Sequence, residues 1–293
     1  MPASRSSVGP VDSLPRPLAV AIHDAGAANM IAAWAEAADS PPERVWAEGP
    51  ARSIWESRFG TGALVETAPA LLDGVQCLLS GTGWASDLEH RARQEAARRG
   101  IRSIAVIDHW VNYAMRFERD GARQLPDALW VGDEYAQSIA GQAFPAIPLA
   151  RHRNLYFEQQ VAGAGPVPGG GDILFVAEPA RSDWGRDRQG EFQALDHFMA
   201  KRAMLGIDPG VAMRLRPHPS DEPGKYDAWL AAHRGAALDP SPDMAAALRP
   251  ARWVVGLNSV ALVIALGAGR DAISALPPHA PPCSLPHSDI RRL

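Results

Sequence analysis

The sequence predicts an α/β protein made of two Rossmann-like, doubly wound domains with a cleft between them. Short β-rich runs alternate with helical stretches from Pro17 onward, the pattern of a parallel sheet covered by helices on both faces. The length of 293 residues suits two domains better than one. A segment rich in glycine and proline, residues 160–171, separates two series of these units and has the composition of a flexible linker.

The first domain is expected over residues 16–159. The apolar run at 18–24 indicates a buried strand, and the stretch at 28–38 indicates the helix after it. A charged amphipathic stretch at 87–99 predicts a further helix, which Gly100 ends. The other elements expected here are strands at 44–49, 75–81, 101–108 and 128–133 and a helix at 53–59.

The second domain is expected over residues 172–280, where the alternation starts again. Its expected elements are strands at 172–178, 210–219 and 252–259 and helices at 191–205, at 226–233 and after 259. Residues 1–15 are rich in serine and proline and lack the apolar core of a signal peptide, so we expect a disordered leader. Residues 281–293 form the C-terminal tail, and analogy with other two-domain enzymes favours its return to the first domain.

Composition narrows the possible partners. The formal charge is -4, the pI is about 6.1 and the arginines are scattered, so a nucleic-acid partner is not expected. The only cysteines, Cys77 and Cys283, suggest neither a metal site nor a disulfide scaffold, which favours the cytoplasm. The longest apolar run, residues 253–267, is too short to cross a bilayer. Peripheral membrane contact and the oligomeric state are left open.

Cofactor and metal motifs are missing from the sequence. There is no Asp-x-Asp pair and no His/Cys cluster with ligand spacing, so we expect no metal. The turn that contains Gly81 and Thr82 resembles a phosphate cradle but lacks the lysine of a P-loop, so no cofactor is expected. This turn could line the acceptor side of the cleft, and a plain strand-to-helix turn is at least as compatible with it.

Two polar motifs follow strands of the second domain. In residues 216–219 (RPHP), two prolines fix the backbone, so that Arg216 and His218 could hold a phosphate. The alternative is a rigid turn that only ends the strand. Asn258 and Ser259 begin an apolar helix, where a hydroxyl and N–H groups can bind an anion. An ordinary helix N-cap explains the same residues.

The first domain offers three candidates for a general base. Asp24 follows the first strand and precedes a turn of small residues in which Gly26 would let a substrate approach the backbone. Its alternative role is a helix cap. Asp108 and His109 compete for the task. Residues that follow them could form a sugar-stacking wall or belong to the core: Trp110, Asn112, Tyr113 and Arg116.

Together these features resemble the GT-B glycosyltransferases, in particular the bacterial sialyltransferase and polysialyltransferase-like enzymes that use CMP-sugars. The resemblance implies His218 and Ser259 as donor-phosphate ligands, with Arg216 and Asn258 beside them. Many GT-B enzymes carry a ribose-binding glutamate in the helix after the serine, but residues 260–267 contain no acid. Glu178, near the further donor-binding candidate Arg181, could replace it, or main-chain groups could bind the ribose. A salt bridge between Glu178 and Arg181 is the alternative.

The sequence thus predicts a metal-independent glycosyltransferase of polysaccharide biosynthesis. It would move a sugar from a nucleotide-sugar donor, a CMP-sugar by preference, to a hydroxyl of a glycan or other acceptor. A nucleotide-sugar hydrolase or 2-epimerase of the same fold is the alternative. A two-domain binding protein of the periplasmic type is a third hypothesis, against which the expected lack of an export signal counts.

Overall fold

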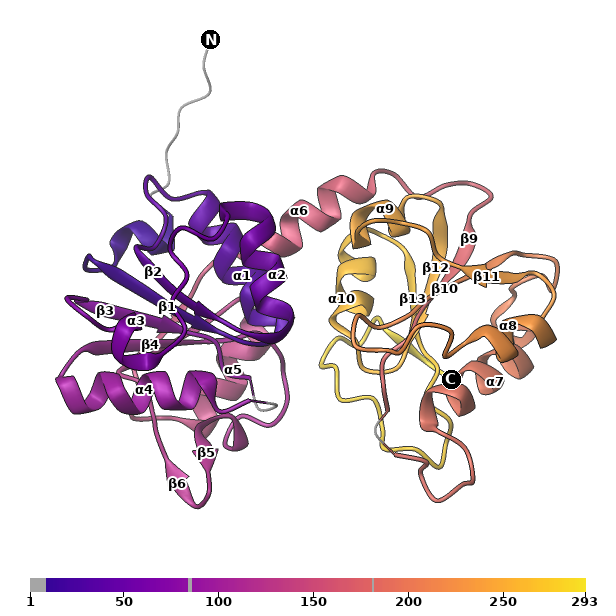
Figure 1. Cartoon of the computed structure of the whole chain (residues 1–293). Coiled ribbons are helices and arrows are strands. Elements are labelled where there is room, and N and C mark those ends of the chain that lie inside the picture. The colour runs from indigo at the N-terminus through magenta and orange to yellow at the C-terminus, as the bar shows by residue number, and fades with distance from the viewer. Residues whose placement is uncertain (1–8, 84–85, 181) are drawn as a thin grey trace, which may run out of the picture. The chain divides into compact units, whose positions relative to one another are not determined.

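The structure, a computed structural model, describes residues 9–83, 86–180 and 182–293. The chain forms two compact units, Met1–Tyr156 and Phe157–Leu293. Each unit contains a six-stranded sheet in which every pair of neighbouring strands is parallel (Figure 1). The predicted fold class, α/β with two Rossmann-like parallel-sheet domains, is confirmed.

The sheet of the first unit has the order β2-β1-β3-β4-β7-β8. Its strands are β1 (Leu18–Ile22), β2 (Arg44–Ala47), β3 (Cys77–Ser80), β4 (Arg102–Ile107), β7 (Ala128–Val131) and β8 (Leu149–Arg151). The chain moves from β1 to β2 on one side and then returns to add β3 on the other. The strand order therefore reverses between β1 and β3, the place where ligands bind in sheets of this kind.

Alternate residues of β1 pack on opposite faces of this sheet, because successive side chains of a strand point to opposite sides. Leu18, Val20 and Ile22 belong to a core with α1 (Ala25–Glu36) and α2 (Gly49–Phe59). Ala19 and Ala21 belong to a second core with α3 (Ala68–Leu71) and α4 (Leu88–Arg99). Burial on both faces explains why the strand is apolar throughout. Further elements of this unit are α5 (Glu134–Ala143), the hairpin β5 (Glu118–Arg119) and β6 (Ala122–Arg123), and the 3₁₀ helices Pro10–Ser13 and Met115–Phe117.

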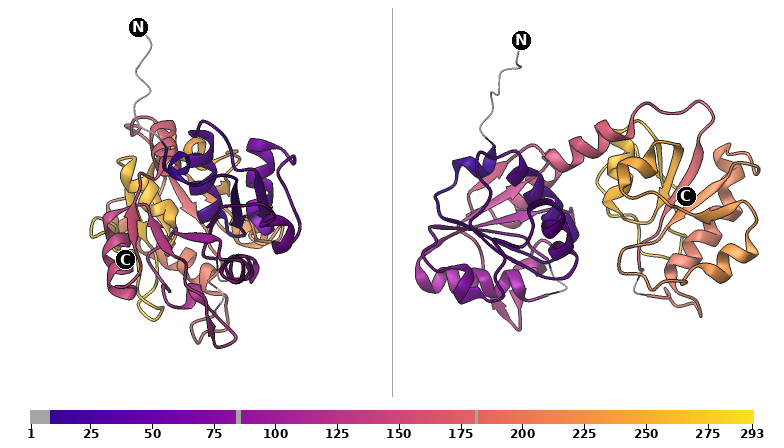
Figure 2. Two further views of the ribbon diagram at one scale, coloured as in Figure 1. Left: turned by 90° about the vertical axis from the view of Figure 1, so that its left-hand side faces the viewer. Right: turned by 45° about the horizontal axis from the view of Figure 1, so that its top comes forward.

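The sheet of the second unit has the order β11-β10-β9-β12-β13-β14 and reverses between β9 and β12. Figure 2 gives two further views of the chain, in which this unit is coloured from pink through orange to yellow. Its strands are β9 (Asp172–Val176), β10 (Met213–Arg216), β11 (Ala236–Leu238), β12 (Ala251–Gly256), β13 (Asp271–Ser274) and β14 (Arg291–Arg292). One core joins the sheet to α7 (Gly190–Lys201) and α8 (Asp227–Ala232). The other helices are α6 (Leu155–Ala164), α9 (Met244–Leu248), α10 (Val260–Gly267) and the 3₁₀ helix Arg202–Leu205.

The ends and the connection between the units differ from expectation. Val11 and Leu14 are buried in the first core, so apolar packing orders this part of the expected disordered leader. Residues 160–164 of the expected flexible linker lie in α6. In the C-terminal tail, β14 pairs with β13 of the second unit, and Leu285 and Ile290 are buried. The sequence does not predict the strands β8, β11, β13 and β14, because they are too short to show a clear hydrophobic periodicity.

Candidate functional site

Three carboxylates gather at the carboxyl ends of β1, β3 and β4, and each lies directly against a glycine. An added Cβ would meet a carboxylate oxygen at 1.8 Å at Gly26 (Asp108), 2.9 Å at Gly81 (Glu89) and 2.6 Å at Gly83 (Asp24). Real Cβ atoms essentially never approach so closely. These glycines therefore admit acidic side chains of the protein. The space beside Gly26, which was expected to admit a substrate, is filled in the structure by the carboxylate of Asp108.

Asp24 occupies the N-cap position of α1 but does not cap it through its side chain. Its Oδ1 lies 2.8 Å from His23 Nδ1, and its side chain retains 30% of its exposure. The imidazole of His23 also lies against Gly49, where a Cβ would come within 2.7 Å of Nε2. Asp24 is therefore an oriented and accessible carboxylate at the reversal point of the first sheet.

Asp108 is more enclosed than Asp24 and has a cationic partner. Its Oδ1 accepts a hydrogen bond from Arg116 Nη1 at 2.9 Å, and its side chain is 14% exposed. The same guanidinium donates to Thr82 Oγ1 at 3.0 Å, and the hydroxyl of Thr82 donates to the Val106 carbonyl at 2.9 Å. Thr82 is completely buried, so these contacts give it a structural task.

The residues after Asp108 contribute mainly to the core. Trp110 and Tyr113 are buried, as is Arg116, so three of the four residues of the expected sugar-stacking wall are not surface groups. Trp110 Nε1 donates to the Asp133 carboxylate, at 3.0 and 3.1 Å to its two oxygens. His109 Nδ1 accepts the N–H of Trp110 at 2.9 Å.

Glu89 of α4 is a member of this cluster that was not predicted. It is 0% exposed, its Oε1 accepts the N–H of His23 at 2.9 Å, and its Oε2 has no hydrogen-bond partner among the described residues. Burial raises the pKa of Glu89 to about 7, opposed by the charge of Arg93 and assisted by that of Asp24. A sequence signal was available, because Glu89 lies three and seven residues before the buried Ala92 and Ala96.

In the second unit, Glu178 and Asn258 meet where β9 and β12 diverge. The carboxylate Oε1 of Glu178 accepts the N–H of Asn258 at 3.0 Å. Burial raises the pKa of Glu178 to about 7, and the hydrogen bond from Asn258 opposes this effect. The side-chain oxygen of Asn258 accepts the N–H of Ser284 at 2.7 Å. The structure thus brings together two residues that are 80 positions apart in the sequence.

Ser259 is the N-cap of α10, and its hydroxyl accepts the N–H of Ala261 at 3.2 Å. The first turn of α10 contains no acidic residue, so no side-chain carboxylate within it neutralises the positive end of the helix dipole. The N-cap interpretation therefore describes Ser259 correctly. It is compatible with phosphate binding, since a capping hydroxyl still has a proton to donate.

Arg216 and His218 have different surroundings. Arg216 Nη1 donates to the buried carboxylate of Asp239 at 2.6 Å and to the Ser241 carbonyl at 2.8 Å. His218 Nδ1 lies 2.7 Å from Ser220 Oγ and accepts the N–H of Ser220 at 3.2 Å. This acceptor role places the ring proton on Nε2, which is a donor that suits a phosphate oxygen. Arg216 is thus committed to an ion pair, whereas the Nδ1 atom of His218 is held by Ser220.

The described residues contain neither a metal-binding cluster nor a membrane-spanning helix. Arg181 lies outside the described residues. In residues 9–83, 86–180 and 182–293, no group of three or more His, Cys, Asp or Glu residues is arranged to hold a metal ion. Within the same ranges, no helix is both long and apolar enough for a membrane span.

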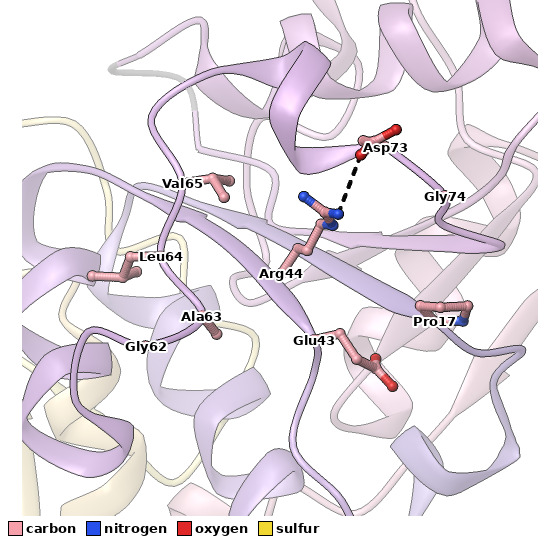
Figure 3. A pocket seen from close by; sticks show the side chains of 9 residues that line it. All are labelled: Pro17, Glu43, Arg44, Gly62, Ala63, Leu64, Val65, Asp73 and Gly74. Carbon is pink, nitrogen blue, oxygen red and sulfur yellow. Dashed lines mark hydrogen bonds and ion pairs between the residues drawn. The ribbon is translucent and has the colours of Figure 1, made fainter.

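A pocket lies beside the first sheet, and Figure 3 shows the residues that line it, among them Pro17, Arg44 and Asp73. Pro17 precedes β1, and Arg44 is the first residue of β2, so this pocket lies beside the amino ends of strands. Arg44 forms a hydrogen bond of 3.3 Å with Asp73 across it. Ligands of doubly wound sheets bind at the carboxyl ends, so we do not assign this pocket to the candidate site.

No protein-family model matches the sequence, and no curated protein matches it. Solved structures are similar. MnaA of S. aureus in complex with UDP is 11% identical, with a TM-score of 0.61 over 88% of this chain and 78% of the other. UDP-GlcNAc 2-epimerase of Neisseria meningitidis bound to UDP-GlcNAc is 10% identical, with a TM-score of 0.59 over 88% and 81%. The glycotransferase of kitacinnamycin is 14% identical, with a TM-score of 0.53 over 96% and 87%. At these identities the similarity supports the GT-B-like fold, and it gives no support to a CMP-sialyltransferase in particular.

Proposed function

We propose that this chain is a nucleotide-sugar enzyme that binds the donor phosphate in its second unit and supplies acid/base chemistry from its first. The observation that carries the proposal is the division of charge between the two points of strand reversal. Three carboxylates occupy the first, whereas the second has the start of α10 with Ser259 and Asn258 beside the carboxyl group of Glu178. A phosphate is repelled by the former and attracted by the latter.

The donor phosphate would accept hydrogen bonds from the start of α10 and from His218. Ser259 offers its hydroxyl there, at the positive end of the α10 dipole, while the N–H groups of Ala261 and Leu262 bond to Ser259 itself. His218 would donate from Nε2. Arg216 keeps its pairing with Asp239 and holds the end of β10 without touching the donor.

Asp24 would act as the general base. A base needs a reachable carboxylate of fixed orientation, and Asp24 is more exposed than Asp108 or Glu89. His23 orients it through the Nδ1 contact. Asp108, paired with Arg116, would hold the loops in place, and His109 remains the other candidate base.

A 2-epimerase or hydrolase is the second candidate, and one observation favours it. Such enzymes need several acid/base groups near the sugar, and the structure adds His23 and Glu89 to the neighbourhood of Asp24. The ligands named for the similar structures, UDP and UDP-GlcNAc, make a UDP-sugar the first donor to test, ahead of a CMP-sugar.

Thermal unfolding with UDP, CMP, GDP, dTDP and UDP-GlcNAc tests the proposal first, because a ligand that binds the folded state raises the unfolding midpoint. Incubation with UDP-GlcNAc then separates the reactions. UDP release without an acceptor indicates hydrolysis, release only with an acceptor indicates transfer, and a new sugar epimer indicates epimerisation. If none of these ligands shifts the midpoint, the proposal is wrong.

A further inference from the structure

A buried ion-pair cluster joins the two loops that follow β9 and β10. We define it as Glu191 of α7, Asp221 after β10, and Lys225 before α8. Lys225 Nζ lies 2.5 Å from Glu191 Oε1 and 2.6 Å from Asp221 Oδ1. The two carboxylates are 3% and 2% exposed, respectively, so a single ammonium balances two buried acids. Buried acids are retained only with such compensation.

One arm of the cluster reaches the loop of His218. Asp221 Oδ2 accepts the backbone N–H of His218 at 2.9 Å and the hydroxyl of Tyr226 at 3.0 Å. Although burial opposes it, the hydrogen bonds from Lys225 and His218 hold the pKa of Asp221 below its usual value. Asp221 is therefore an ionised acceptor that fixes the backbone from which the His218 ring projects.

The other arm reaches the loop that follows Glu178. Glu191 Oε2 accepts the N–H of Ala180 at 3.3 Å. Ala180 lies two residues after Glu178, whose carboxylate holds the N–H of Asn258 at the start of α10. The cluster thus connects by hydrogen bonds to both sides of the phosphate site.

We propose that Lys225 is a positioning residue that fixes the His218 loop and the loop after Glu178 in register for phosphate binding. This inference rests on the proposed function of that site. The reason is electrostatic: without the ammonium, Glu191 and Asp221 repel each other, and Asp221 can no longer both stay ionised and hold the His218 N–H.

The test compares Lys225→Met and Lys225→Arg with Lys201→Met, which changes the only other lysine of the sequence. Calorimetric titration with UDP should show an affinity loss of about tenfold in Lys225→Met, the loss of one well-placed hydrogen bond, and recovery in Lys225→Arg. Lys201→Met should bind UDP as the unchanged protein does. A double variant, Lys225→Met with Glu191→Gln, restores the charge balance and guards against loss of folding.

A double-mutant cycle separates positioning from general destabilisation. If Lys225 acts through His218, adding His218→Ala to Lys225→Met should cost little further affinity, whereas independent effects would multiply. The ¹⁵N shifts of the His218 ring, assigned by their loss in His218→Gln, give a readout that needs no nucleotide. They should move in Lys225→Met and return in Lys225→Arg. Unchanged ring shifts in Lys225→Met overturn the positioning role, whereas a wild-type protein that fails to bind UDP overturns the proposed function instead.

Discussion

The strand order reverses at a different place in the sheet of each unit, and different side chains gather at the two places. In the first sheet the order reverses between β1 and β3, and three carboxylates lie against three glycines there. In the second it reverses between β9 and β12, where the carboxyl group of Glu178 holds the backbone at the start of α10. In the proposed function, the carboxyl ends of the first sheet would therefore move protons and those of the second would hold an anion. The position of a site follows from strand order, whereas its chemistry follows from a few side chains.

Among the proposed variants, Asp24→Asn should have the largest effect. If Asp24 of the first unit is the general base, turnover of the nucleotide sugar should fall about 10³-fold, within the usual range for such a residue. Affinity for UDP-GlcNAc should stay the same. Steady-state kinetics and calorimetric titration measure the two effects separately.

Asp73→Asn is the matched control for that variant, because Asp73 is an exposed acid at the other edge of the same sheet. It should leave both turnover and affinity unchanged. A parallel loss of affinity in Asp24→Asn would instead make Asp24 a structural residue and transfer the role of base to His109.

Glu89→Gln should stabilise the first unit at high pH. The pKa of Glu89 is raised to about 7, so between roughly pH 4.5 and 7 the folded state binds more protons than the unfolded state, and its stability falls as pH rises. Above pH 7 the cost of the buried charge is complete. Glutamine still accepts the N–H of His23 and removes that cost, so we expect a gain of about 3 kcal/mol at pH 8 and almost none at pH 4. Denaturant unfolding at both pH values measures it, and an equal effect at the two would refute the assignment.

The sequence predicts strands such as β1 and β3 well because each is buried along its whole length. It misses short, partly exposed strands such as β8 and β11. The sequence also predicts which residues follow the strands: Asp24 follows β1, and Asn258 and Ser259 follow β12, as expected. What escapes it are contacts across the fold. Glu89 resembles an ordinary acid of a charged helix, although its spacing from Ala92 places it on the buried face.

Long-range partners also decide what a predicted side chain can do. Arg216 looks like a phosphate ligand until Asp239, which is 23 residues away, is seen to pair with it. Thr82 looks like part of a phosphate cradle until its hydroxyl is seen to donate to Val106. Local sequence cannot show such partners, because strand pairing brings them together only in the folded sheet.

Ser259→Ala tests the proposed phosphate site, and the loss of another helix N-cap in the same unit is its control. Removing an N-cap hydroxyl should cost about 1 kcal/mol of stability, and if Ser259 also donates to the donor phosphate, affinity for UDP-GlcNAc should fall about tenfold. Asp243 caps α9 through the N–H of Ala246, so Asp243→Ala loses a cap in the same unit. It should show the loss of stability without the loss of affinity. Equal affinities in the two variants would leave Ser259 with the role of a cap alone.

The smallest expected effect is a pH dependence of UDP-GlcNAc affinity that arises from Glu178. It tests whether the carboxyl group of Glu178 lies near the bound phosphate. With a pKa raised to about 7, Glu178 is partly neutral near neutral pH, and a phosphate nearby favours its protonated form further. Binding should therefore take up a proton, so affinity for UDP-GlcNAc should decline about fivefold from pH 6 to pH 8. UDP-GlcNAc suits the measurement because its diphosphate, esterified at both ends, does not titrate in this range. Glu178→Gln is the control, since it removes the carboxyl group and with it this contribution to the decline. If Glu178→Gln shows the same decline as the unchanged protein, Glu178 does not sense the phosphate, and its hydrogen bond to Asn258 serves only to shape the turn before α10.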